Sequence, residues 1–211
     1  MRTNVYIDAA NLFYGGEKSL GWRIDYEKLY QYLKEKYEVD QVVFFGGVDI
    51  YNFPFDYLAQ DSVPIHELEQ YFTNLIERGK ETERRLISFQ RRLQRVRFYR
   101  KLEEFGYVLV LKPVKLHYDA QGKPVRKANC DVDMTLYLLQ HQAKYDRVIV
   151  MSGDGDFLPV LKFLRAQGKK VLIFARGPRT ARELKGFAGD EFLDFEYLRE
   201  RIKQIHTDTA I

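Results

Sequence analysis

Two aspartates stand among glycines in the stretch SGDGDF, residues 152–157, directly after the apolar run RVIVM. Glycine-rich turns usually bind phosphates through backbone N–H groups, and an anion site would not be lined with Asp154 and Asp156. The stretch is therefore either a plain strand-to-helix turn, in which Asp156 caps the following helix, or part of a cation site.

Three more aspartates occupy comparable places in the sequence. Asp8 follows the apolar run VYI, with Asn11 three residues further on, and Asp131 and Asp133 open the segment DVDMTLYLL. Each has an ordinary explanation, because Asp is a preferred N-cap and negative charge stabilises a helix N-terminus by about 0.3–1 kcal/mol. Capping explains each acid separately, but it does not predict their common position at the ends of strands and the starts of helices.

The elements that must position these acids alternate between strands and helices. Apolar runs predict strands at TNVYID, QVVFFGGVD, YVLVLKP, RVIVMSG and KKVLIFA. Helical spacing is found in RIDYEKLYQYLKEKY, over about residues 64–105, in DVDMTLYLLQHQAKY and in FLPVLKFLRAQG. KLHYDAQGKPVRKAN is typical of a short hairpin, and FLDFEYLRERIKQI of a closing strand and helix. This order predicts an α/β, Rossmann-like fold with a mostly parallel sheet and helices on both faces.

Ligands of an open α/β sheet bind beyond the carboxyl ends of its strands. We therefore expect Asp8, Asp154 and the helix start at Asp131 to meet at one edge of the sheet. Several carboxylates in one place need a counter-cation to stay ionised, and ligation by oxygen alone suits Mg²⁺ or Mn²⁺. Such an ion can activate water for attack on a phosphodiester. Ser152 and Asn11 would orient a metal-bound water or, equally, hydrogen-bond the backbone of a turn.

The length of 211 residues fits one α/β domain, which we expect over residues 1–205, with 206–211 as a tail. The lone Cys130 excludes an internal disulfide and fits a reducing cytoplasm. The chain enters an apolar strand almost at once and holds no apolar run of roughly 18 residues. We therefore expect no signal peptide, no membrane span and a cytoplasmic location.

Positive charge is concentrated in one segment. Residues 78–101 have a net charge of +8, whereas the rest of the chain has −4. Within the basic helical element expected over 78–105, helical spacing places Arg84, Arg91 and Arg95 on one face and Leu86, Phe89 and Leu93 on a buried stripe. The basic face predicts contacts to RNA phosphates; the alternatives are a solvated helix face or a contact with a second copy or another protein.

A second basic group follows the strand KKVLIFA and contains Arg176, Arg179, Arg182 and Lys185. Arg176 and Arg179 would hold nucleic acid at the same edge, unless they belong to a loop of solvated arginines. Lys127, just before the acid pair, would steady a phosphate or be an ordinary exposed lysine. The four histidines share no metal-ligand spacing and are interpreted as surface or packing residues: His66, His117, His141 and His206.

With these residues in hand, the chain resembles the NYN-domain proteins, which are LabA-like members of the PIN-like nuclease superfamily. The matching stretches run in the family's order over nearly the whole chain: VYIDAANLF, FYRKLEEFGYVLVLKPVK, KANCDVDMTLYLL, RVIVMSGDGDFLPVLKFLRAQGKKVLIF and ELKGFAGDEFLDFEYL.

The resemblance implies a PIN fold and a metal-dependent ribonuclease site. The family's acids fall on Asp8, on Asp131 and Asp133, and on Asp154 and Asp156, and its Asn falls on Asn11. Many members carry a further acid inside the helix after the D-x-D pair, where this chain has Tyr137.

The favoured hypothesis is a Mg²⁺- or Mn²⁺-dependent endoribonuclease acting on single-stranded RNA, with Asp8, Asp131 and Asp154 as the first ligands and Asp133 and Asp156 ligating directly or through water. The alternative is a non-catalytic RNA- or protein-binding regulatory module. A phosphatase or phosphotransferase ranks lowest, because such an enzyme favours a D-x-D turn after the first strand and this chain has IDAANLF there.

Overall fold

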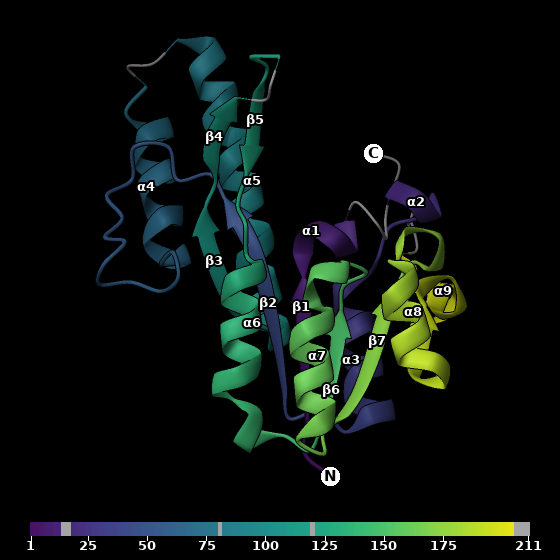
Figure 1. The fold of residues 1–211 in the computed structure, drawn as a ribbon. Helices are drawn as coiled ribbons and strands as arrows, with labels where there is room; N and C mark the ends of the chain where they lie inside the picture. Colours follow the sequence, from purple (N-terminus) through teal and green to yellow (C-terminus); the bar gives the residue numbers. More distant parts are fainter. Residues whose placement is uncertain (14–17, 80–81, 119–120, 205–211) are drawn as a thin grey trace. The chain divides into compact units, whose positions relative to one another are not determined.

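A computed structural model describes residues 1–13, 18–79, 82–118 and 121–204, without the side chains of residues 117 and 124–127 (Figure 1). The chain divides into two compact units: residues 1–44 with 131–211, and residues 45–130. The predicted tail, 206–211, lies outside the described residues, and a single domain over 1–205 stays a prediction.

The main sheet has the strand order β3-β2-β1-β6-β7-β8, and β1, β6, β7 and β8 pair in parallel within the first unit. The bounds of its strands are β1 (Thr3–Asp8), β2 (Gln41–Val48), β3 (Val108–Pro113), β6 (Arg147–Met151), β7 (Lys170–Ala175) and β8 (Phe192–Asp194). β1 is buried along its whole length, as expected of a strand covered on both faces.

Helices cover both faces of this sheet: α6 and α7 lie in front of it in Figure 1 and α3 lies behind. The helices of the first unit are α1 (Ala9–Asn11), α2 (Lys18–Leu20), α3 (Tyr26–Tyr37), α6 (Asp131–Gln140), α7 (Leu158–Ala166), α8 (Arg182–Ala188) and α9 (Arg199–Ile202). Short 3-10 turns lie at 142–144, 155–157, 177–179, 189–191 and 195–198. The predicted α/β fold with a mostly parallel sheet is confirmed, whereas α8 was not predicted as a helix.

The register of the sheet places the chemically interesting residues at one edge. Ile7 pairs with Met151, so Asp8 and Ser152 follow side by side at the carboxyl ends of β1 and β6. Ala175 pairs with Asp194, which brings the residues after β7 to the end of β8. Parallel pairing therefore gathers segments that are far apart in the sequence.

The second unit contains two helices where the sequence suggested one long stretch over 64–105. α4 (Ile65–Glu77) and α5 (Glu83–Phe105) are separate, with Gly79 in a left-handed conformation (φ 61°) between them. His66 contacts Glu103, and Glu69 contacts Arg97 and Arg100, so the helices are antiparallel. The prediction of a continuous helical stretch was wrong because a left-handed glycine interrupts the helical backbone.

α5 buries the predicted apolar stripe only in part. Phe89 and Leu93 are buried, whereas Leu86 near the start of the helix is half-buried. The predicted hairpin is confirmed: β4 (Lys115–Tyr118) pairs antiparallel with β5 (Pro124–Lys127). No helix in the described part of the chain is long and apolar enough to span a bilayer.

Candidate active site

Asp8 is the centre of a buried polar cluster at the carboxyl end of β1. Its side chain is the N-cap of α1, because Oδ1 accepts hydrogen bonds from the backbone N–H groups of Ala10 (3.0 Å) and Asn11 (3.2 Å). The hydroxyl of Ser152, at the end of the neighbouring strand, donates to Oδ2 at 3.1 Å. Asp8 is only 8% exposed and Ser152 1%. The capping interpretation of Asp8 is therefore correct, and one oxygen still faces the adjacent strand.

Asn11 ties the start of α1 to the turn after β6. Its Oδ1 accepts a hydrogen bond from the backbone N–H of Gly153 at 3.0 Å. The N–H of Asp154 donates to Ser152 Oγ at 3.2 Å, and the N–H of Asp156 donates to Asp154 Oδ1 at 3.0 Å. Asp154, not Asp156, is thus the side chain that caps the turn, because it precedes the helical residues. Capping by Asp156 was a wrong expectation.

The glycines of SGDGDF are explained by close packing against the segment that follows β7. A Cβ on Gly153 would lie 2.9 Å from Thr180 Oγ1 and 3.0 Å from Thr180 Cα, and one on Gly155 would lie 2.5 Å from Glu183 Oε1. The N–H of Ala181 donates to the carbonyl of Gly153 at 2.9 Å. These glycines let two backbone segments approach, and the turn needs no phosphate to explain them.

Burial and a neighbouring acid both disfavour the charge on Asp8. Loss of hydration raises the pKa of its carboxyl group, and the nearby Asp131 raises it further, while hydrogen bonds from Asn11, Ser152 and Ala10 oppose the shift. Among the residues that the structure describes, no Lys or Arg forms an ion pair with Asp8. Asp8 therefore lies in a negatively charged environment, and no basic side chain among the described residues pairs with it.

Two acids, not a group of three or more, are the candidate protein ligands for a divalent cation at this edge. Within the described ranges, no group of three or more His, Cys, Asp or Glu side chains stands close enough to hold a metal ion. Mg²⁺, however, is usually bound by one or two carboxylates and completes its shell with waters and substrate phosphates. The pair Asp8 and Asp131, with the hydroxyl of Ser152 and only oxygen ligands, is a donor set of that kind.

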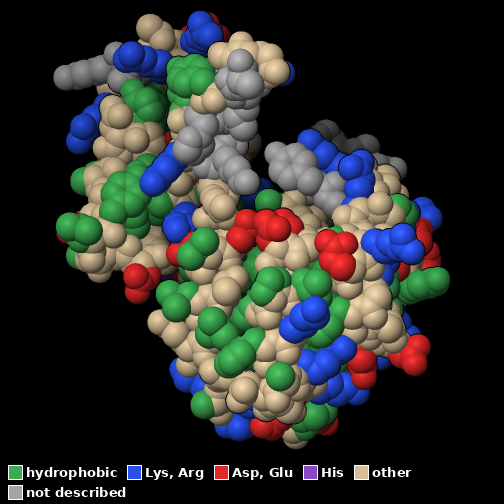
Figure 2. Space-filling view, in the orientation of Figure 1, with side chains coloured by type: hydrophobic (Ala, Val, Ile, Leu, Met, Phe, Trp, Pro, Cys, Tyr) green, Lys and Arg blue, Asp and Glu red, His purple; other side chains and the backbone are tan. Residues whose placement is uncertain are grey.

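The other predicted ligands come from the first turn of α6 and from the turn after β6. Asp131 and Asp133 are both in the first turn of α6, and both are half-buried. Asp154 is half-buried and Asp156 exposed. In Figure 2 acidic side chains gather near the N-terminal ends of α6 and α7. Direct ligation by Asp133, Asp154 and Asp156 stays a prediction.

The basic segment after β7 has a role in folding that the sequence did not reveal. Arg176 Nη1 donates to Asp194 Oδ2 at 3.0 Å, and only 20% of its side chain is exposed. The N–H of Gly177 donates to the same oxygen at 3.0 Å. Arg179, by contrast, is exposed and makes no side-chain hydrogen bond or ion pair with any described residue. Of the two predicted RNA contacts in this segment, Arg179 has the side chain available for one.

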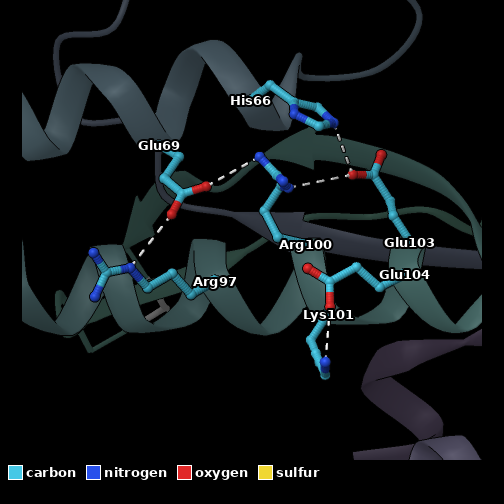
Figure 3. A network of polar contacts seen from close by, with 7 residues as sticks. All are labelled: His66, Glu69, Arg97, Arg100, Lys101, Glu103 and Glu104. Carbon is cyan, nitrogen blue, oxygen red and sulfur yellow. Dashed lines mark hydrogen bonds and ion pairs between the residues drawn. The ribbon is translucent and has the colours of Figure 1, made fainter.

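The arginines of α5 fall into two groups. Arg97 and Arg100 are paired with Glu69 of α4 at 3.3 and 3.2 Å, within the network that Figure 3 shows with His66 and Glu103. Arg92 is paired with Asp49 at 3.1 Å. These arginines connect α5 to its own unit, so they contribute less to an external surface than the sequence suggested.

Two of the three α5 arginines that were predicted to contact RNA belong to the other group. Arg84 and Arg91 are exposed and form no ion pair with any residue that the structure describes. Arg95 is also exposed, but it donates to Tyr99 Oη at 3.2 Å and lies over the Phe98 ring at 5.0 Å. The side chain of Lys127 lies outside the described residues, although its backbone pairs with Lys115.

The histidines behave as the sequence suggested where they are described. His66 Nε2 lies 3.1 Å from Glu103 Oε2, and His141 packs against Tyr137 with ring centroids 4.6 Å apart. The side chain of His117 and the whole of His206 lie outside the described residues. Tyr137, at the place of the missing family acid, therefore has a packing role. Cys130, the single cysteine of the sequence, is buried and forms no internal disulfide.

Comparisons with known proteins agree with this fold. The model of the NYN domain family matches residues 2–199, so the chain belongs to that family, as its motifs predicted. Low amplitude and bright protein LabA of Synechococcus elongatus is 23% identical over 205 residues, covering 96% of this chain and 88% of that protein.

Solved structures give a similar result. A protein of unknown function from Vibrio parahaemolyticus has a TM-score of 0.62 at 18% identity, with 96% of each chain covered. T5 5′-exonuclease with bound divalent zinc ions has a TM-score of 0.44 at 17% identity, covering 88% of this chain and 60% of that one. The Vibrio structure supports the assignment of the fold. With a TM-score of 0.44, the T5 structure supports no further conclusion about this chain.

Proposed function

We propose that this protein is a divalent-metal-dependent ribonuclease that hydrolyses phosphodiester bonds within single-stranded RNA. Membership of the NYN domain family supports a nuclease activity. The observation that carries the proposal is the environment of Asp8, a buried carboxylate at the carboxyl edge of an α/β sheet and close to Asp131. Asp8 itself has no basic partner among the described residues.

The residues around Asp8 prepare it to hold a cation. The Ser152 hydroxyl and the two N–H groups of α1 fix the orientation of the carboxylate before any ligand arrives. Asn11 fixes the turn that carries Asp154 through its bond to Gly153. Asp131 supplies the second negative charge. Preorganisation of this kind reduces the reorganisation that binding and reaction require.

Asp8 and Asp131 would hold Mg²⁺ or Mn²⁺, with Asp133, Asp154 and Asp156 as direct or water-mediated supports. When bound, the ion supplies activation of water and neutralisation of the charge that develops on a phosphoryl oxygen. Hydrolysis forms one P–O bond to the water oxygen and breaks the P–O bond to the leaving ribose oxygen. The exposed cations Arg179, Arg84 and Arg91 would contact phosphates of the strand, with Arg95, Arg176 and Lys127 as the remaining predicted contacts.

The test is cleavage of labelled single-stranded RNA by the purified protein in Mn²⁺, in Mg²⁺ and in EDTA. We expect cleavage with either ion and none in EDTA. Asp8→Asn keeps a capping side chain but removes the charge, so we expect it to lower the rate by about a hundredfold or more, beyond the 10–100-fold typical of a residue that only supports a ligand. Asp154→Asn likewise keeps a capping side chain and removes the charge in the turn after β6, and we expect it to lower the rate as well.

Asp190→Asn is the matched control, because Asp190 is an exposed carboxylate outside the site. Circular dichroism of each variant checks that it is folded. Cleavage that persists in EDTA, or that survives both Asp8→Asn and Asp154→Asn, contradicts the proposal.

The second candidate is a non-catalytic RNA-binding module. One observation favours it: no three acids of the described residues stand in a ligating arrangement. It predicts RNA binding that is equally tight in Mn²⁺ and EDTA and is unaffected by Asp8→Asn, with no turnover.

A further inference from the structure

A concave site lies in the first unit, and none of the acids described above belongs to its lining. It is a cavity of about 550 Å³, within the range of small-ligand sites, and its lining includes Phe13, Lys18, Trp22, Arg23, Lys203 and Gln204. No residue of the proposed active site belongs to this lining.

Two distant segments of the chain are joined to form the wall of this cavity. Ile24 and Lys203 form an antiparallel bridge. The N–H of Asp25 donates to the carbonyl of Ile202 at 2.8 Å, and the N–H of Gln204 donates to the carbonyl of Arg23 at 2.9 Å. Backbone hydrogen bonds therefore join the two segments of the wall, and Arg23 and Lys203 lie on these two paired segments.

The lining combines positive charge with aromatic rings. Lys18, Arg23 and Lys203 contribute three cations, and the described lining contains no Asp or Glu. Lys18 Nζ lies 5.3 Å from the centroid of the Phe13 ring. Arg23 and Lys203 are exposed and make no side-chain ion pair with any residue described. A ligand with a negative charge and a flat ring would match both features.

Trp22 provides an independent indication of a ligand. It is only 5% exposed, yet its indole Nε1–H has no hydrogen-bond partner among the residues that the structure describes. Buried indole N–H groups normally have a partner, and leaving one unsatisfied is unfavourable. A ligand atom that accepts a hydrogen bond would remove this cost.

We propose that this cavity binds one nucleotide unit of a single-stranded RNA, outside the site of cleavage. The base contacts the rings of Phe13 and Trp22 and accepts the indole hydrogen bond, while the phosphate contacts Arg23 and Lys203. The choice of RNA rests on the proposed function. Phe13 follows Asn11 by two residues, so the cavity begins where the helix capped by Asp8 ends.

Trp22 is the only tryptophan of the chain, so its fluorescence reports on this cavity alone. The experiment titrates the whole protein, in EDTA to prevent cleavage, with adenosine 5′-monophosphate and separately with a short single-stranded RNA. We expect saturable quenching by the RNA. For Arg23→Ala and for Lys203→Ala we expect weaker binding, with the slope of log K against log salt reduced by about 0.7 for each phosphate that the variant no longer neutralises.

Lys162→Ala is the matched control, because Lys162 is an exposed lysine of α7 in the same unit but outside the cavity. Quenching by the monophosphate as well would show that a single nucleotide suffices, and quenching by RNA alone would show that the strand is needed. Both results support the site. Absence of quenching by either probe, or an identical effect of Arg23→Ala and Lys162→Ala, overturns it.

The outcome is separate from that of the cleavage assay. Quenching that depends on Arg23 in a protein without nuclease activity would retain the cavity and refute the proposed function. If Asp8→Asn abolishes cleavage while Trp22 fluorescence does not respond to RNA, the proposed function is retained and the cavity proposal is refuted.

Discussion

Asp8 and Asp194 occupy equivalent positions in the same sheet, yet their carboxylates have different partners. Each ends a parallel strand, and Oδ1 of each caps the helical turn that follows. At Oδ2 they differ. Asp194 accepts from the guanidinium of Arg176 and from the N–H of Gly177, both at 3.0 Å. Among the described residues, Asp8 accepts at Oδ2 only from the Ser152 hydroxyl, and it lies near another acid. One aspartate is paired with an internal cation, whereas the other has no basic partner among the described residues.

The largest effect on stability is expected from breaking the internal pair. Asp194→Asn leaves the Arg176 guanidinium, which is only 20% exposed, with Glu196 at 3.9 Å as its remaining acid. We expect a loss of about 2 kcal/mol in the free energy of unfolding, measured by urea denaturation at pH 7. A loss no larger than that of the exposed control Asp190→Asn would show that the two aspartates are not distinguished in this way.

Asp8→Asn should have the opposite effect on stability in EDTA. Burial raises the pKa of Asp8 in the folded protein, so its contribution to stability is complete below the ordinary pKa of Asp, about 3.9, and is lost as the pH rises through the raised value. Asn has no such loss. We expect the stability of Asp8→Asn relative to the unaltered protein to increase between about pH 4 and pH 7. A constant difference across this range would exclude a raised pKa.

A divalent cation should reverse that difference. A ligand that binds only the folded state stabilises by about 2.7 kcal/mol at one hundred times its Kd. We expect Mn²⁺ to raise the melting temperature of the unaltered protein and of Asp190→Asn, but not that of Asp8→Asn. Equal shifts in all three proteins would place the bound ion elsewhere.

The packing between the two turns of this edge is tested by a pair of glycines. Gly153→Ala places a Cβ 3.0 Å from the backbone of Thr180, so we expect a loss of about 1–3 kcal/mol. Gly186→Ala, in α8, meets nothing within 4 Å and should stabilise by about 0.5–1 kcal/mol, since Ala is the better helix former. Urea denaturation measures both. A similar response of both variants would mean that the turn tolerates an extra methyl group.

The smallest effect compares two arginines of α5. Arg91 is exposed and unpaired within the described residues, whereas Arg97 is paired with Glu69 at 3.3 Å. We expect Arg91→Ala to reduce the salt dependence of RNA binding by about 0.7 in the slope of log K against log salt, and Arg97→Ala to change it less. Filter binding at several salt concentrations measures the slopes. An equal change would show that pairing with Glu69 does not matter.

Much of the fold could be predicted because it follows from local patterns. The buried strand β6 contains a continuous apolar run, β1 contains the shorter run VYI, and the alternation of strand and helix leads to a parallel sheet. The split between α4 and α5 was missed because helical spacing continues in sequence across Gly79, and only its left-handed backbone shows that the helix has ended.

The site could be predicted at the level of which elements meet, but not which side chains pair. Parallel topology indicated that Asp8 and the turn after β6 share an edge, and the bond to Ser152 agrees. The pairing of Arg176 with Asp194 was missed, because it depends on the register of β7 and β8. The cavity at Trp22 was missed because neither its bridge nor an unsatisfied N–H has a signature in sequence.

The bond between Asp8 and Ser152 joins residues 144 positions apart, and this separation has a consequence for synthesis. A ribosome adds about 5–20 residues per second, so Asp8 emerges many seconds before the strand that completes its surroundings. Contacts of such long range also form late during folding. The nascent chain therefore carries Asp8 without its Ser152 partner until β6 has been made, so this polar cluster is completed only late in synthesis.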